Sequence, residues 1–163
     1  MPEVIADTSV MQYLFQSNHF LLLPNLYENL VIPKAVKNEL DEGRKLGILL
    51  PQPSDYEWIQ PVAVEEQRLV PQIPGLGQGE REVLSLSMKQ QNALALLDDG
   101  LARQYARRLN IRVTGTLGIL LKAKQSGLID QIGPVIDSLK QLGFRVSEET
   151  QAAILSLAAE ATW

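Results

Sequence analysis

The sequence predicts an α/β protein in which helices cover both faces of a mainly parallel sheet. Two observations predict this class. Short apolar runs that suit buried strands alternate with longer segments whose apolar residues recur at helical spacing. Acidic residues also close two of these runs or stand in the first turns of helices, and in a parallel sheet these places share one edge.

The chain opens with a strand and a helix. Residues 4–6 are apolar and strand-like, and Thr8 or Ser9 can cap the helix that follows. A short helix is expected near residues 25–30, and it leads into a second strand that Pro33 ends.

The middle of the chain begins with a charged helix and then becomes irregular. The helix is expected at about residues 34–45, with Gly47 as its stop. Several prolines interrupt residues 48–79. Within that segment residues 58–64 predict an edge strand, because an interior strand would not tolerate Pro61.

The rest of the chain alternates again between helix and strand. The expected elements are a helix at 79–89, a strand at 93–97, a helix at 98–110, a strand at 111–116 and a helix at 117–127. Residues 130–163 predict two more helices around a short segment at 144–146, with Ser147 as the cap of the last one. We expect one domain over residues 1–163, with 130–163 as a C-terminal helical extension.

Composition limits the chemistry that the chain can perform. Hydrophobic residues make up 45% and no segment is as long as a membrane span, so no membrane association is expected. The absence of cysteine excludes a disulfide framework and a thiolate metal site, and it agrees with a cytoplasmic protein. A single histidine, His19, excludes a His-rich zinc site and disfavours a serine-type triad.

The net charge of −4 argues against a protein that grips nucleic acid tightly over a broad face. It is compatible with a nuclease whose acids are neutralised by metal and whose substrate touches a small basic rim. Four arginines on or just after one predicted helix are candidates for that rim, although they also suit a solvated helix face: Arg103, Arg107, Arg108 and Arg112.

Carboxylates gathered in one place repel one another, so a protein that collects several usually holds a hard divalent cation with them. Asp7 and Asp98 directly follow predicted strands, whereas Glu39 lies in a predicted helix. Asp7 alone could be a helix cap, and Glu39 alone could be a solvated side chain. Their combination favours a site for Mg²⁺ or Mn²⁺ that activates water for phosphodiester hydrolysis.

Two positions of this acidic set stay open. Glu80 and Glu82 are two residues apart and point to different sides of their helix, so only one is expected to reach the metal. Asp98 is preferred over Asp99, because Asp99 can pair with Arg103 one helical turn later. The glycines around Glu80 do not form a phosphate-binding loop, since no Gly-Lys-Ser/Thr ending follows them.

The order and spacing of these blocks resemble the PIN domain, the fold of many metal-dependent ribonucleases and of the VapC-type toxins of toxin–antitoxin pairs. The resemblance rests on IADTSV, VIPKAVKNEL, GQGEREVLSLS and the block that runs from LALLDDGLAR to KQSGLI, and it covers about residues 3 to 145. The last block is most similar to a prokaryotic, nucleic-acid-binding PIN subgroup whose members are mainly uncharacterised.

The resemblance implies a three-layer α/β/α fold with a mainly parallel sheet of about five strands. It also implies an acidic quartet of Asp7, Glu39, Glu82 or Glu80, and Asp98, with Asp99 as a further metal candidate and Mg²⁺ or Mn²⁺ as the cofactor. Supporting polar residues would be Thr8, Ser9, Thr114 and Thr116, and Arg103 and Arg107 would contact RNA.

The expected function is therefore that of a metal-dependent endoribonuclease, possibly the toxin partner of an antitoxin protein. The alternative is a catalytically silent PIN-fold module that binds RNA or a protein. A phosphatase that uses Asp7 is disfavoured, because Ser9 occupies the place of the second acid in the common Asp-x-Asp motif.

Surplus apolar residues predict a homodimer or a higher even oligomer. They lie in the first helix, just after it and in the last helix: Leu14, Phe15, Leu21 to Leu23, Ile154, Leu155 and Leu157.

Overall fold

The computed structural model describes residues 2–66 and 69–160. Its centre is a five-stranded sheet in the order β3-β2-β1-β4-β5, and every neighbouring pair of strands is parallel. The strands are β1 (Val4–Ala6), β2 (Leu30–Pro33), β3 (Ile59–Val62), β4 (Leu94–Leu96) and β5 (Arg112–Thr114). The predicted parallel α/β class is confirmed, and the strand that contains Pro61 lies at the edge as expected.

Eight α-helices and one short 3₁₀ helix, η1 (Pro53–Asp55), connect or follow these strands in the described part of the chain. The helices are α1 (Thr8–Gln16), α2 (Leu22–Tyr27), α3 (Lys34–Lys45), α4 (Gln78–Met88), α5 (Gly100–Arg108), α6 (Thr116–Gln125), α7 (Gly133–Gln141) and α8 (Glu148–Leu157).

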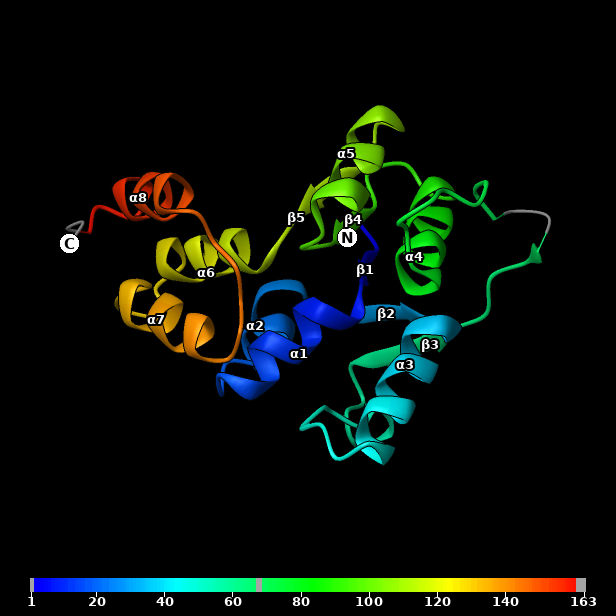
Figure 1. Ribbon diagram of the computed structural model, residues 1–163, viewed down its shortest axis with the longest axis horizontal. Coiled ribbons are helices and arrows are strands. Elements are labelled where there is room, and N and C mark those ends of the chain that lie inside the picture. Colours follow the sequence, from blue (N-terminus) through cyan, green and yellow to red (C-terminus); the bar gives the residue numbers. More distant parts are fainter. Residues whose placement is uncertain (1, 67–68, 161–163) are drawn as a thin grey trace.

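These helices form two groups around the sheet (Figure 1). The first group contains α1, α2, α6, α7 and α8, of which α6, α7 and α8 lie to the left of the strands; the second contains α4 on the right, with α3 below it and α5 above it. The contacts agree with the picture, because α1 and α2 pack on α6, α6 packs on α8, and α4 packs on α3 and α5. The result is the three-layer arrangement that the sequence predicts.

The two central strands lie deepest in the core. Every residue of β1 and β4 is buried, so these strands are continuous apolar runs without polar alternation. That pattern is expected for parallel strands covered on both faces. Ile5, Leu96 and Leu97 are fully enclosed, so the backbone that leads to Asp7 and Asp98 is held on a rigid base.

Helix ends follow local sequence where glycine is present. Gly47 has a φ of 85° and directly follows the cap of α3, and Gly127 has a φ of 77° after the end of α6. Both residues were expected to end these helices, because glycine adopts this left-handed conformation without steric cost. The expected cap of the last helix is also present, since Ser147 Oγ accepts a hydrogen bond of 3.1 Å from Thr150 N.

Two local predictions need correction. The helix expected near residues 25–30 begins and ends earlier, because Glu28 adopts a φ of 66° and Leu30 is needed in β2. The strand expected at 111–116 ends at Thr114, and Thr116 begins α6. The short segment expected at 144–146 does lie between two helices, in the connection from α7 to α8.

The predicted C-terminal extension contains α7 and α8, and its last three residues lie outside the described residues. Glu160 ties it to the rest of the fold. The carboxylate of Glu160 accepts hydrogen bonds from Ile132 N at 2.7 Å, Gly133 N at 2.9 Å and Lys124 Nζ at 2.9 Å. Among the described residues, no helix combines the length and the apolar character that crossing a membrane requires.

The apolar residues behind the oligomer prediction are mostly used inside the protomer. Leu14, Leu23 and Leu155 are buried in the core. Only Leu21 and Leu157 of that set remain well exposed, at 62% and 67%. Most of the apolar side chains on which the oligomer prediction rests are therefore buried within the protomer.

Candidate active site

An open pocket of about 510 Å³ lies at the carboxyl edge of the sheet, and we call it the acid pocket. It collects side chains from the ends of β1 and β4, from α1, α3 and α4, and from the connection between α7 and α8. The residues that line it are Asp7, Thr8, Ser9, Gln12, Tyr13, Glu39, Glu80, Asp98, Asp99, Gly143, Phe144 and Arg145.

Asp7 forms the deepest part of this site. It is the residue before α1, but its side chain makes no cap hydrogen bond to that helix, so helix capping does not explain it. The residue is only 5% exposed. Burial, followed by the charges of Glu80, Glu39 and Asp98, raises the pKa of Asp7 to about 8, although a hydrogen bond from the Thr8 backbone opposes the shift.

Glu39 joins three helices at the edge of the pocket. Its Oε1 accepts a hydrogen bond of 3.1 Å from Gly79 N at the start of α4, and its Oε2 accepts one from the Thr8 hydroxyl of α1. A Cβ added to Gly79 would come within 2.6 Å of Glu39 Oε1, so only glycine leaves room for the carboxylate there. Glu39 is therefore exposed to solvent but held in position by two hydrogen bonds.

Helix α4 directs its two glutamates differently, as their spacing requires. Glu80 points into the acid pocket, where burial and then the charge of Asp99 raise its pKa to about 7. One of its oxygens, Oε2, is buried and has no hydrogen-bond partner among the described residues. Glu82 does not line the pocket and instead accepts a hydrogen bond of 3.1 Å from Ala35 N at the start of α3. The carboxylate that α4 brings to the pocket is thus that of Glu80, not that of Glu82.

Asp98 is held by the start of α6. Its Oδ1 accepts from Thr116 N and its Oδ2 accepts from Thr116 Oγ1, both at 2.7 Å. Burial raises the pKa of Asp98, although these hydrogen bonds and the charge of Arg103 oppose the effect. Thr116 itself is fully buried, so it supports Asp98 from behind rather than lining the pocket.

Asp99 also borders the acid pocket but has a structural task. Its carboxylate caps α5 by accepting a hydrogen bond of 2.9 Å from Ala102 N. The ion pair with Arg103 that its spacing allows is not formed. Arg103 instead donates to Leu97 O at 3.3 Å.

The predicted basic rim is divided between two ends of the molecule. Arg103 lines a second pocket that adjoins the acid pocket, as does Thr114, whereas Arg107 is exposed and lines neither. Arg108 lies over the ring of Tyr105 at 5.3 Å. Arg112 begins β5, so it lies at the opposite edge of the sheet.

The structure adds residues that the sequence did not single out. Gln12 and Tyr13 enter the acid pocket from α1. They lie three and four positions after Ser9, so helical periodicity could have found them. Phe144 and Arg145 come from the α7–α8 connection, which no local pattern places at this edge.

The donor set fits a hard divalent cation in its chemistry, because all the acidic groups that line the pocket with Asp7 are carboxylates apart from the Tyr13 phenol, and no His, Cys or Met lines it. The unpartnered Glu80 Oε2 is one oxygen that a cation would satisfy. However, no three His, Cys, Asp or Glu side chains of the described residues already stand so that they could hold a metal ion. Binding would therefore require side chains such as Glu39 and Asp98 to rearrange.

A family model described as a PIN domain matches residues 3–160. Comparison with curated proteins finds no significant match. The matched range contains every carboxylate of the acid pocket and includes α7 and α8. PIN domains have a nuclease-like fold and are generally nucleases. The chain belongs to the PIN-domain family.

Proposed function

We propose that this PIN-domain protein is a metal-dependent endoribonuclease. The observation that carries the proposal is the convergence of carboxylates from two strand ends and two helices on one pocket, with a buried Glu80 oxygen left without a partner. A stable fold does not need such a cluster, because the carboxylates repel one another. Clustered groups with strongly raised pKa values are typical of functional sites.

Asp7, Glu39, Glu80 and Asp98 are the residues that would hold Mg²⁺ or Mn²⁺. When bound, such a cation lowers the pKa of water and stabilises negative charge on the phosphate. Thr8 orients Glu39, and Thr116 orients Asp98. These two threonines, at the starts of α1 and α6, therefore position two of the acids, and we propose Ser9 as a further polar contact for the substrate.

The raised pKa values of the acid pocket should make metal binding depend on pH. Asp7 and Glu80, with pKa values of about 8 and about 7, retain protons near neutral pH in the metal-free protein. Metal binding competes with these protons, so affinity for Mn²⁺ should rise as the pH rises through this range.

The direct test combines metal binding with RNA cleavage. Wild-type protein and Asp7→Asn are titrated with Mn²⁺ by calorimetry and are then incubated with labelled RNA, with Mn²⁺ or with EDTA. We expect Mn²⁺ binding and EDTA-sensitive cleavage by the wild type and neither by the variant. Equal Mn²⁺ binding by both proteins would contradict the metal site.

One observation favours a second candidate, a catalytically silent module that binds RNA or protein. Glu39 and Asp98 are already engaged in hydrogen bonds, and the described residues offer no preformed metal cluster. The same assay separates the two functions. RNA binding without cleavage at any Mn²⁺ concentration would favour the silent module.

The biological setting is a further part of the proposal. We propose that the nuclease works in the cytoplasm as the toxin of a toxin–antitoxin pair. A small adjacent gene for a DNA-binding antitoxin, together with growth arrest on expression that the antitoxin relieves, would support this role.

Assembly into a homodimer or a higher even oligomer is also proposed, with exposed Leu21 and Leu157 as the remaining apolar contacts. Light scattering should then give an even multiple of the 18.1 kDa chain mass. A monomer at micromolar concentration would end this part of the proposal.

A further inference from the structure

A second pocket of about 440 Å³ adjoins the acid pocket. The two share Asp98, Phe144 and Arg145, so the α7–α8 connection forms a wall common to both. The remaining lining residues come from α5, β5, α6 and α8 and include Arg103, Thr114, Ser147 and Thr150. Together the pockets form one path along the carboxyl edge, from the clustered acids toward α8.

Electrostatic character changes along this path. The acid pocket has five carboxylates and one arginine, namely Asp7, Glu39, Glu80, Asp98 and Asp99 with Arg145. The ionisable residues of the second pocket are Asp98, Arg103 and Arg145. Its charge is therefore positive, although the chain as a whole is acidic with a net charge of −4.

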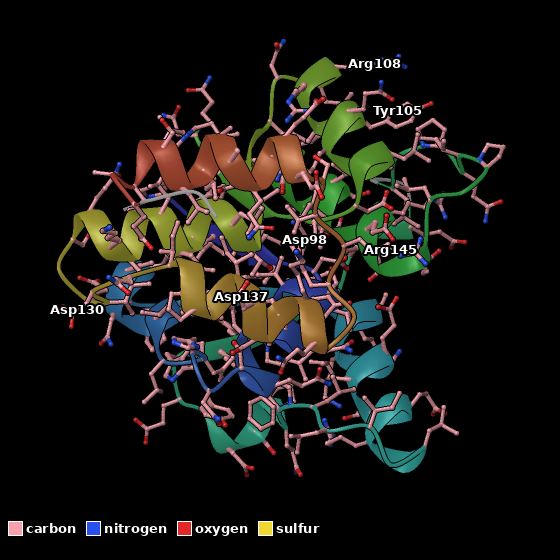
Figure 2. All side chains as sticks on the ribbon, turned by 60° about the vertical axis from the view of Figure 1, so that its left-hand side comes forward. Asp98, Tyr105, Arg108, Asp130, Asp137 and Arg145 are labelled. Carbon is pink, nitrogen blue, oxygen red and sulfur yellow. The ribbon has the colours of Figure 1, made fainter. Side chains whose placement is uncertain are left out.

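Arg145 stands at the junction and has no structural task of its own. It is exposed and makes no hydrogen bond or ion pair with the described residues. Figure 2 labels it beside the orange connection between α7 and α8, on the same side of the molecule as Asp98. An exposed arginine that borders both pockets is free to bind an anion.

The backbone that carries Arg145 is nevertheless anchored at both ends. Phe144 N donates to Leu139 O at 2.9 Å, and the Phe144 ring packs edge-on against Tyr13 with centroids 5.1 Å apart. Two residues after Arg145, Ser147 caps α8. The exposed Arg145 side chain can change conformation, but the backbone at Arg145 is fixed beside the two pockets.

We propose that the second pocket binds a backbone phosphate next to the scissile one in single-stranded RNA, with Arg145 and Arg103 as its phosphate-binding residues. The inference deepens the proposed nuclease function and rests on it. Arg145 is the exposed member of the pair, and Arg103 is a partly buried member held by Leu97 O. Arginine suits this role because its planar fork can donate two hydrogen bonds to one phosphate.

The aromatic residues favour a single strand over a duplex. Phe144 and Tyr13 are half-buried and line the acid pocket beside Arg145. Unpaired bases stack on aromatic rings, whereas bases in a duplex are already stacked and present mainly phosphate and sugar to a protein. Asp7 is also buried at the base of its pocket, so the strand must enter the pocket to reach it.

The test measures binding without turnover. A labelled single-stranded oligoribonucleotide is titrated in EDTA with wild type, Arg145→Gln and Arg108→Gln, and binding is followed by fluorescence anisotropy at several salt concentrations. Arg108→Gln is the matched control, since it removes the same charge from the far end of α5, over Tyr105, and lines neither pocket (Figure 2).

Arg145→Gln should weaken RNA binding by about tenfold and reduce the salt dependence of binding by the equivalent of about one phosphate contact, while Arg108→Gln stays near wild type.

Ser147→Asp provides an independent variant. Aspartate caps a helix as well as serine does, so α8 is kept while a negative charge enters the second pocket. This variant should also weaken binding. An unchanged affinity of Arg145→Gln, or an equal loss in Arg108→Gln, would overturn the proposal.

Kinetics in Mn²⁺ separate this inference from the proposed function. Arg145→Gln should raise KM with little change in kcat, because it removes substrate binding rather than chemistry. If the wild type binds RNA through Arg145 but never cleaves it, the nuclease proposal fails and the phosphate site stands. If cleavage occurs with a KM independent of Arg145, the phosphate site fails and the nuclease proposal stands. Duplex RNA that binds as tightly, with the same dependence on Arg145, would overturn the preference for a single strand.

Discussion

The two edges of the parallel sheet differ in chemistry. At the carboxyl edge the acid pocket holds five carboxylates. At the opposite edge a pocket of about 360 Å³ is lined by apolar and neutral polar side chains, the polar ones including Gln90, Gln91, Asn92 and Asn110. Arg112 is its charged residue, and it donates to Asn92 O at 3.2 Å.

The two edges use their polar groups in different ways. The polar groups at the opposite edge serve the turns that join helices and strands, and Asn92 and Asn110 both adopt positive φ values there. The carboxyl edge instead keeps Asp7 and Glu80 in positions that raise their pKa values to about 8 and about 7. Carboxyl groups whose surroundings disfavour the charged form reduce folding stability. Such groups are expected at a functional site, where folding stability is not the main constraint.

The largest expected effect separates the two neighbouring aspartates of the carboxyl edge. Asp98→Asn should lower kcat/KM by at least about a hundredfold, because it removes a proposed metal ligand. Asp99→Asn should lose less than about tenfold, because asparagine also caps a helix and can replace the bond to Ala102 N. RNA cleavage in Mn²⁺ measures both. The opposite order would mean that Asp99 is the metal ligand of this pair.

The second prediction concerns pH and the metal-free protein. Because the pKa of Asp7 is raised from 3.8 to about 8 and that of Glu80 from 4.5 to about 7, the folded state holds more protons than the unfolded state between these values. The stability that the folded state gains by keeping Asp7 and Glu80 protonated is thus fully present below about pH 4. It is lost as the pH rises toward about 8. Urea unfolding in EDTA should show a free energy of unfolding that is several kcal/mol lower at pH 8 than at pH 5.

Asp7→Asn is the variant that sharpens this measurement. Asparagine carries no charge at any of these pH values, so the loss of stability toward pH 8 should become smaller. The same pH dependence in both proteins would show that Asp7 is not the group responsible.

The third prediction compares alanine substitutions at two glycines, one beside Glu39 and one away from the acid pocket. Gly79→Ala would place a Cβ 2.6 Å from Glu39 Oε1 and so displace a carboxylate of the acid pocket, and cleavage should fall by about tenfold. Gly100→Ala is the control, since a Cβ at the first residue of α5 meets nothing within 4 Å. Cleavage rates and circular dichroism of both variants distinguish a local effect from misfolding. Equal activities would mean that the position of Glu39 does not matter.

The smallest expected effect lies at the opposite edge. Arg112→Gln removes one exposed hydrogen bond to Asn92 O, so the free energy of unfolding should change by less than about 0.5 kcal/mol. RNA affinity should stay within about twofold of wild type, in contrast to Arg145→Gln. If Arg112→Gln lost as much RNA affinity as Arg145→Gln, the RNA-binding surface would include the opposite edge of the sheet.

Much of the fold could be predicted because its signals are local. The apolar runs at β1 and β4 are buried on both faces, and their ends at Asp7 and Asp98 follow directly from where each run stops. Pro61 marked an edge strand because proline cannot donate to a sheet ladder. The short helix α2 was placed too late, since the positive φ of Glu28 is unusual for glutamate and has no sequence signal.

The sequence by itself determined the alternation of strands and helices, the strand ends that carry acids and the absence of soft metal ligands. Tertiary structure alone decided between Glu80 and Glu82, because both stand on α4 and only the packing of α4 against α3 turns one carboxylate inward. It also brought Arg145 to the site from the far end of the chain. Local patterns specify which elements form and which face of each is apolar, whereas contacts between distant segments depend on how those faces pack.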